Sequence, residues 1–138
     1  MQKAAFILCA ILTVGLYQAA SAANEVVIVT SFPKELFETY KQAFETRHPD
    51  LTVVVKSKQT SALVAYIRET GARPDADLVW ASATDAFAVL KADSLLAAHT
   101  LPEHIANRIP ATIGPYPIHD PDGRFFGFAL SGYGIMWN

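Results

Sequence analysis

Hydroxyl side chains recur in this sequence at one kind of place, the ends of short apolar runs that are typical of β-strands. Five of them, Ser31, Thr60, Ser61, Ser82 and Thr84, follow such runs, and Ser131 and Tyr133 precede the last one. In an open parallel α/β sheet, ligands bind beyond the carboxyl ends of the strands, where the N-termini of the following helices also point. Backbone N–H groups and the helix dipole favour carboxylate, phosphate or similar anions there. These hydroxyls therefore predict a site for a small anion.

Helix capping is the competing explanation for Ser61 and Ser82 taken singly, because serine is a common N-cap residue. Residues 59–61 are expected to supply the N-cap of one helix, and Ser82 with Asp85 has the Ser-x-x-Asp spacing of a capping box for the next. Hydroxyls at three successive strand ends favour a shared anion site over capping alone.

Other reactive residue types are not arranged for chemistry. The four histidines, His48, His99, His104 and His119, lack the close spacing of metal ligands. Residues 120–123 predict a tight turn rather than a calcium loop, because Phe125 stands where such a loop needs glycine. Neither a glycine-rich phosphate loop nor a nucleophile elbow is present. The sequence therefore predicts no catalytic residue, no metal site and no cofactor.

Three apolar runs must position the hydroxyls. Residues 26–30, 51–55 and 78–81 predict strands covered on both faces. Helices are predicted over residues 34–48, 62–70 and 82–91, with Pro33 at the start of the first and Gly71 as the C-cap of the second. Three strand–helix units in succession indicate an α/β fold whose parallel-type sheet has helices on both faces.

The remaining chain is richer in proline and turns. A short helix over residues 103–109, an aromatic strand over 124–130 and a last apolar strand over 132–138 are expected. No polar tail or breaker follows the last strand, which would leave an open sheet edge. We therefore expect an incomplete domain, the N-terminal fragment of a longer protein.

Composition narrows the class of protein. The sequence has 138 residues, is 51% hydrophobic and carries a net charge of -2, which suits one small domain and excludes a disordered chain. No basic surplus exists to bind a phosphate backbone, so no nucleic-acid partner is expected. A single cysteine excludes a disulfide scaffold.

Residues 1–23 predict a secretory signal peptide. Lys3 precedes an apolar stretch over residues 4–16, and Ala20-Ser21-Ala22 forms a small-residue cleavage site. The apolar stretch is shorter than the roughly 20 residues that a membrane-spanning helix needs. After cleavage, residues 24–138 are expected to be exported to the periplasm and not to span a membrane.

The order of these features resembles the N-terminal part of periplasmic solute-binding proteins of ABC importers, in the iron(III)-type group that includes phosphoglycerate-transport regulatory proteins. The resemblance rests on TSFP at residues 30–33, FETRHP at 44–49, QTSALVAYI at 59–67, RPDADLVWAS at 73–82 and YGIMWN at 133–138. It implies a type II periplasmic-binding fold, of which residues 24–138 are the first lobe and the second lobe is missing.

The resemblance also implies a function and a site. The family's ligand positions fall on Ser31, Thr60, Ser61, Ser82 and Ser131. Iron-binding members place histidine or tyrosine near the first strand, whereas this strand ends in Ser31-Phe32-Pro33, which favours an organic or phosphorylated anion over ferric iron. The expected function is capture of that anion for an ABC permease. The alternative is a signalling accessory that regulates transporter expression through a sensor kinase.

Overall fold

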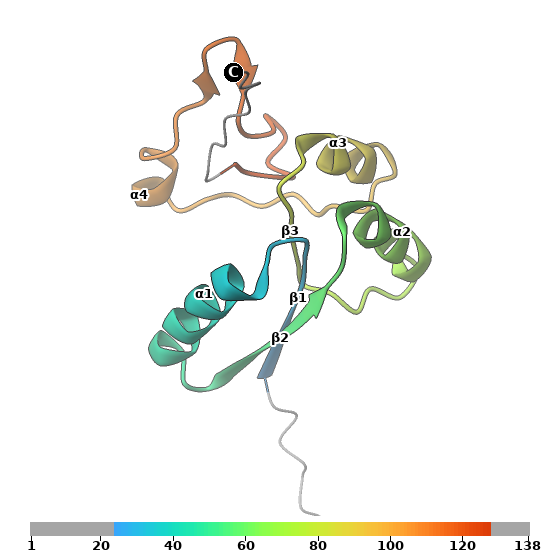
Figure 1. The fold of residues 1–138 in the computed structure, drawn as a ribbon. Coiled ribbons are helices and arrows are strands. Elements are labelled where there is room, and N and C mark those ends of the chain that lie inside the picture. The colour runs from blue at the N-terminus through green and yellow to red at the C-terminus, as the bar shows by residue number, and fades with distance from the viewer. Residues whose placement is uncertain (1–23, 128–138) are drawn as a thin grey trace, which may run out of the picture.

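The computed structural model describes residues 24–127, in which a parallel sheet forms the centre. Its strands are β1 (Asn24–Thr30), β2 (Leu51–Ser57) and β3 (Leu78–Trp80), in the order β2-β1-β3 (Figure 1). Both neighbours run parallel to β1, so the predicted parallel α/β arrangement is confirmed for this part of the chain. The predicted signal peptide, the strand over 132–138, Ser131 and Tyr133 lie outside the described residues.

The strands form where β-branched residues are concentrated. Such side chains are stiff and pack well on a pleated surface. Ile28 of β1 lies between Val55 of β2 and Leu78 of β3, so the central strand is paired on both sides. β1 begins two residues earlier than predicted and β2 extends to Ser57, while β3 ends one residue early at Trp80.

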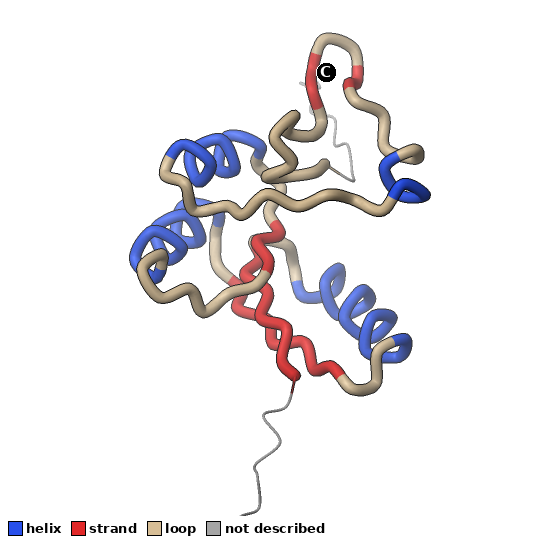
Figure 2. Tube along the Cα trace, turned by 180° about the vertical axis from the view of Figure 1, so that it is seen from behind, coloured by secondary structure: helices blue, strands red, loops and turns tan. Residues whose placement is uncertain are grey.

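Three helices flank the sheet, α1 (Lys34–Arg47), α2 (Thr60–Thr70) and α3 (Thr84–Ala92). The chain moves from β1 outward to β2 and then crosses back past β1 to β3. Because parallel crossovers are right-handed, these opposite movements place α1 on one face and α2 on the other. α3 packs beside α2 (Figures 1 and 2), so helices cover both faces as predicted.

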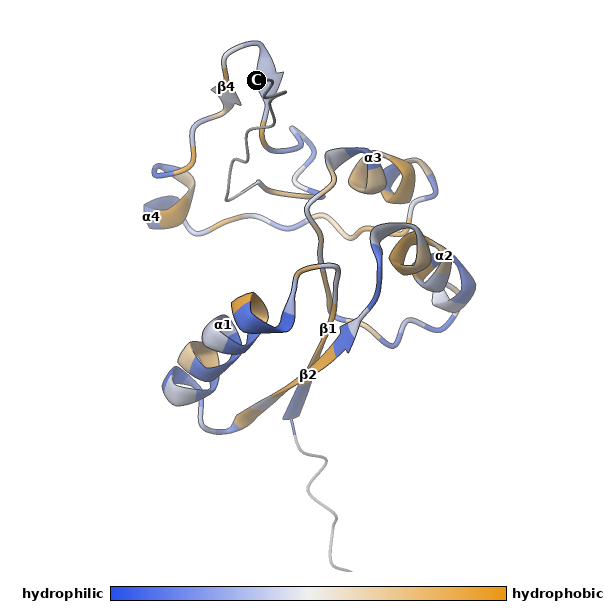
Figure 3. Cartoon of the chain, in the orientation of Figure 1, coloured by the Kyte–Doolittle hydropathy of each residue, from blue (hydrophilic) through white to orange (hydrophobic). Residues whose placement is uncertain are grey.

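The larger core lies between the sheet and the α2–α3 pair. Val29, Leu63, Ile67 and Leu90 are buried together there, and Val79 packs against them. On the α1 face, Phe37 and Val53 are buried. Figure 3 shows apolar residues gathered along the strands and on α2 and α3. Within residues 24–127, none of the helices is both long enough and apolar enough to cross a membrane.

Residues 93–127 form a loosely structured layer beyond the carboxyl ends of the strands (Figure 1). It contains α4 (Glu103–Ala106) and an antiparallel hairpin of β4 (Thr112–Ile113) and β5 (Tyr116–Pro117). The hairpin was not predicted, since its two-residue strands carry no hydrophobic alternation. α4 is shorter than the predicted helix, and it ends three residues before Ile109.

The predicted turn at residues 120–123 is confirmed. The Gly123 N–H donates to the Asp120 carbonyl oxygen at 2.9 Å, and Gly123 has a φ of 68°. The aromatic strand expected after it appears, in the described part, only as an isolated antiparallel bridge between His119 and Phe126. We call residues 119–126 the aromatic hairpin.

Candidate functional site

Ser31 stands at the junction of β1 and β3. Its N–H donates to the Trp80 carbonyl oxygen at 3.2 Å, which joins the carboxyl ends of the two strands. The Ser31 side-chain oxygen is enclosed and has no hydrogen-bond partner within the described part of the chain. The Phe32 N–H donates to the Thr30 hydroxyl at 3.1 Å, and this tight turn leads through Pro33 into α1.

The sheet order gives this junction special importance. β1 and β3 are neighbours in the order β2-β1-β3. The chain after β1 enters α1 on one face of the sheet, and the chain after β3 enters α3 on the other face. Such a switch point opens a crevice beyond the carboxyl ends of the strands, and ligands of α/β proteins commonly bind there. Ser31 follows β1 and Ser82 follows β3, so both predicted residues belong to the switch point.

An aromatic cluster of Phe32, Tyr40 and Trp80 borders Ser31. The Trp80 ring lies 5.2 Å from the Phe32 ring and 5.3 Å from the Tyr40 ring, measured between centroids, with Tyr40 edge-to-face. Tyr40 is 52% exposed, so the cluster combines packing with an accessible apolar surface. The cluster was not predicted from the sequence, because only the fold brings α1 over the end of β3.

Thr60 and Ser61 lie together in an open groove between α2 and α3. The groove has a volume of about 700 Å³, and the first turn of α3 contributes Ala83 and Asp85 to it. Arg68 also lines it, and Arg68 Nε donates a hydrogen bond to Asp93 Oδ2 at 2.6 Å within an ion pair. We call this hollow the α2–α3 groove. It contains one carboxylate and one guanidinium among its lining residues, so its charge is mixed rather than purely basic.

Ser82 and Thr84 are exposed, and neither lines the α2–α3 groove. The structure thus pairs Thr60 with Ser61, and it places Ser31 and Ser82 separately at the switch point. The other two predicted residues, Ser131 and Tyr133, lie beyond the described range.

The N-cap of α2 is Gln59, within the predicted residues 59–61, whereas neither Ser61 nor Ser82 is an N-cap. α2 begins at Thr60 with Gln59 as its N-cap, and α3 begins at Thr84 with Ala83 as its N-cap, and neither N-cap makes a side-chain hydrogen bond. Ser82 therefore lies one residue too early for a capping box, and Asp85 instead accepts a hydrogen bond from the Ala86 N–H at 2.9 Å. Gly71 does end α2 as predicted, in a right-handed helical conformation.

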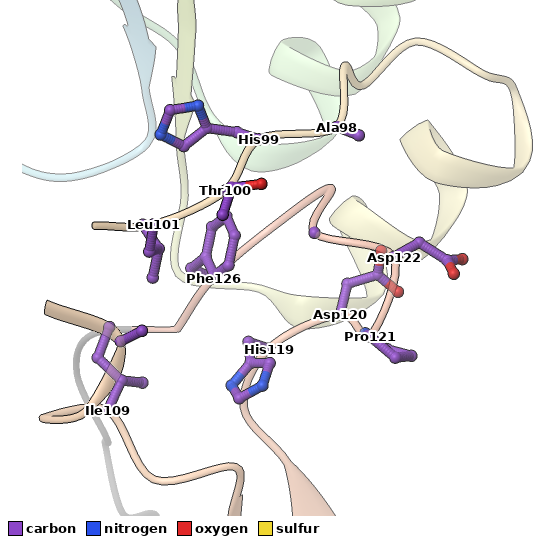
Figure 4. A pocket seen from close by; sticks show the side chains of 12 residues that line it. Ala98, His99, Thr100, Leu101, Ile109, His119, Asp120, Pro121, Asp122 and Phe126 are labelled. Carbon is purple, nitrogen blue, oxygen red and sulfur yellow. The ribbon is translucent and has the colours of Figure 1, made fainter. Parts of the chain in front are cut away.

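A second hollow, which sequence analysis missed, lies between residues 98–101, α4 and the aromatic hairpin. Its volume is about 460 Å³, and His99, Leu101, His119 and Phe126 help to line it. Figure 4 shows the rings of His99 and His119 well apart. Among residues 24–127, no group of three or more His, Cys, Asp or Glu side chains is arranged to hold a metal ion. Segments far apart in sequence form this hollow, so no sequence motif predicts it.

Charged contacts fix the aromatic hairpin beside α3. Lys91 Nζ donates to Asp120 Oδ1 at 2.5 Å and to Asp122 Oδ2 at 2.7 Å. Asp120 is 5% exposed and also accepts a hydrogen bond from the Arg124 N–H at 3.1 Å. The hydrogen bond from Lys91 lowers the pKa of Asp120 against the opposing effect of desolvation, and the same carboxylates raise the pKa of Lys91.

Backbone and ring contacts complete that attachment. The His99 N–H donates to the Gly123 carbonyl oxygen at 2.8 Å, and Arg124 Nη1 donates to the Leu96 carbonyl oxygen. The Phe87 ring of α3 stacks on Phe125, with centroids 5.6 Å apart. The layer beyond the carboxyl ends of the strands is therefore anchored to α3.

Comparison with protein-family models and with curated protein sequences found no match to this chain.

Proposed function

We propose that this chain captures a small anionic solute in the periplasm, an organic or phosphorylated anion rather than ferric iron, and delivers it to an ABC permease. One observation carries the proposal. A parallel sheet of order β2-β1-β3 has hydroxyl residues after each strand, beside the N-termini of α1, α2 and α3. In this proposal, residues 24–138 are the first lobe of a type II periplasmic-binding fold, which closes on its ligand against a second lobe.

The chemistry at the switch point supports an anionic ligand. The first N–H groups of an α-helix have no partner within the helix, and the helix dipole adds positive potential. The enclosed Ser31 hydroxyl, without a partner in residues 24–127, is an unsatisfied hydrogen-bond donor at that place. The neighbouring aromatic cluster offers an apolar surface for the non-polar part of an organic anion.

Isothermal titration tests the proposal. The protein with both proposed lobes is titrated with phosphoglycerates, with small carboxylates and with ferric iron. We expect heat from at least one anion. Ser31→Ala should weaken its binding by roughly tenfold or more, because a hydrogen bond to a charged group contributes about 1.5–3 kcal/mol.

Thr46→Val is the matched control. It removes a hydroxyl from the far end of α1, where Thr46 Oγ1 donates to the Gln42 carbonyl oxygen at 2.7 Å, and should leave affinity unchanged. Absence of heat with every anion would contradict the proposed function. Equal affinity of the Ser31→Ala and Thr46→Val variants would remove Ser31 from the site.

A single lobe leaves its half of the cleft open to water. The proposal therefore predicts weak or undetectable binding by residues 24–138 alone, measured in the same titration. Micromolar affinity from this chain alone would contradict the two-lobe arrangement.

A further inference from the structure

Within residues 24–127, β2 lies at one edge of the sheet. Because the order is β2-β1-β3, only one side of β2 pairs with β1. An edge strand normally exposes a row of N–H and C=O groups to which another chain can add a strand. Val53, in the middle of β2, is nevertheless only 4% exposed, so its outward backbone groups need partners within the protein.

Two side chains of α1 supply those partners. Glu45 Oε1 accepts a hydrogen bond from the Val53 N–H at 2.8 Å, and Lys41 Nζ donates to the Val53 carbonyl oxygen at 2.7 Å. Lys41 and Glu45 also form an ion pair with each other across one helical turn. We call Lys41 and Glu45 the edge pair.

The edge pair reproduces the hydrogen bonds of a neighbouring strand. In a β-strand, the N–H and C=O of one residue point to the same side, so one donor and one acceptor are needed together. A lysine and a glutamate four residues apart on one helix provide that combination. The N–H of Leu51, the previous outward-facing residue, is taken by the His48 carbonyl oxygen at 3.0 Å.

We propose that the edge pair keeps β2 from pairing with β2 of a second copy of this chain. Such a pairing would be antiparallel and two-fold symmetric, because the same edge contributes on both sides. It requires several successive outward-facing residues, which on β2 are Leu51, Val53 and Val55. With the central position occupied by side chains, no continuous ladder forms.

The sequence offers a matched control on the same helix. Lys34 and Glu38 have the same residue types and the same spacing, seven residues earlier, and no hydrogen bond joins them to β2 in the described part of the chain. The double variants Lys41→Ala/Glu45→Ala and Lys34→Ala/Glu38→Ala therefore lose equal charges from one helix, and only the first uncovers Val53.

The experiment is sedimentation velocity of the purified chain and both variants over a concentration series, with hydrogen exchange read at β2. We expect the edge-pair variant to dimerise at a concentration at least about tenfold lower than the control variant, since two backbone groups become available. The amides of Val53 and Val55 should become protected as the dimer forms. A folded edge-pair variant that stays as monomeric as the control would overturn the proposal, as would a dimer without protection in β2.

Single substitutions keep the test decisive if the double variant does not fold. Lys41→Met frees only the Val53 carbonyl oxygen and keeps the packing of a long side chain. Glu45→Gln keeps an acceptor for the Val53 N–H but loses the ion pair. Lys41→Met should dimerise more readily than Glu45→Gln. If both fold and neither self-associates more than the wild-type chain, the edge pair serves only to attach α1 to the sheet.

Discussion

Ser31 and Ser82 follow adjacent parallel strands, yet their surroundings differ. The Ser31 hydroxyl is enclosed beside Trp80, whereas Ser82 is exposed in the loop before α3. An enclosed hydroxyl has already lost its water, so a ligand oxygen that bonds to it gains more than at an exposed one. At the scale of single residues, Ser31 is therefore the strongest of the five predicted hydroxyls that the structure describes.

Gly123 is required by both its backbone conformation and its neighbour. Its φ is 68°, and a Cβ built there would lie 2.6 Å from the His99 carbonyl oxygen. Gly114 has a φ of 57° with nothing within 4 Å of such a Cβ. We expect Gly114→Ala to cost about 1–2 kcal/mol of unfolding free energy from the left-handed conformation alone, and Gly123→Ala to cost more. Urea denaturation of both variants measures the difference, and equal losses would show that the contact with His99 relaxes without cost.

Asp120 should make stability depend on acid pH. The hydrogen bond from Lys91 lowers its pKa in the folded protein. A lowered folded pKa means that the stabilisation is present above the unfolded pKa, which is about 3.9, and is lost as the pH falls through the folded value. Asp120→Asn should therefore flatten the fall in unfolding free energy below about pH 5. Urea denaturation across pH checks this, with the exposed Asp50→Asn as control; an unchanged slope for Asp120→Asn would contradict it.

At the scale of elements, burial decides which apolar residues matter. Leu63 of α2 is fully buried, whereas Leu78, in a run predicted to form a strand covered on both faces, is 50% exposed. Leu63→Ala should lower the unfolding free energy by about 2–5 kcal/mol, because it leaves a cavity in the core between the sheet and the α2–α3 pair. Leu78→Ala should cost about 1 kcal/mol or less. Chemical denaturation measures both, and similar losses would mean that the α1 face beside β3 is as tightly packed as the core.

Secondary structure was predictable in the first part of the chain because local signals agreed there. β-branched runs, the amphipathic spacing of α1 and Gly71 after α2 all indicate the same elements that the structure has. Residues 93–127 carry fewer such signals, since β4, β5 and α4 are only two to four residues long. The capping box failed because α3 begins at Thr84, one residue later than its sequence spacing suggested.

At the scale of the whole molecule, the fold brings opposite charges into the α2–α3 groove. Asp85 lies there with Thr60 and Ser61, and its carboxylate should repel an anion bound to those hydroxyls. Asp85→Asn should then tighten anion binding by a few-fold, as expected for an exposed charge at a helix N-terminus. Titration of this variant checks the sign, with Asp50→Asn, in the loop before the amino end of β2, as control. Unchanged affinity would show that the anion does not bind in the groove beside Asp85.

The sequence by itself determined the α/β class, the parallel strands, the helices on both faces and the position of the turn at Asp120. Hydrophobic periodicity and turn chemistry are properties of short segments, so they can be recognised without knowing how the rest of the chain folds. Only the tertiary structure decided which hydroxyls meet, that Trp80 lies beside Phe32 and Tyr40, and that Lys41 and Glu45 hydrogen-bond to Val53. Those contacts join residues from different elements, and their geometry depends on sheet order and helix packing, which no local pattern encodes.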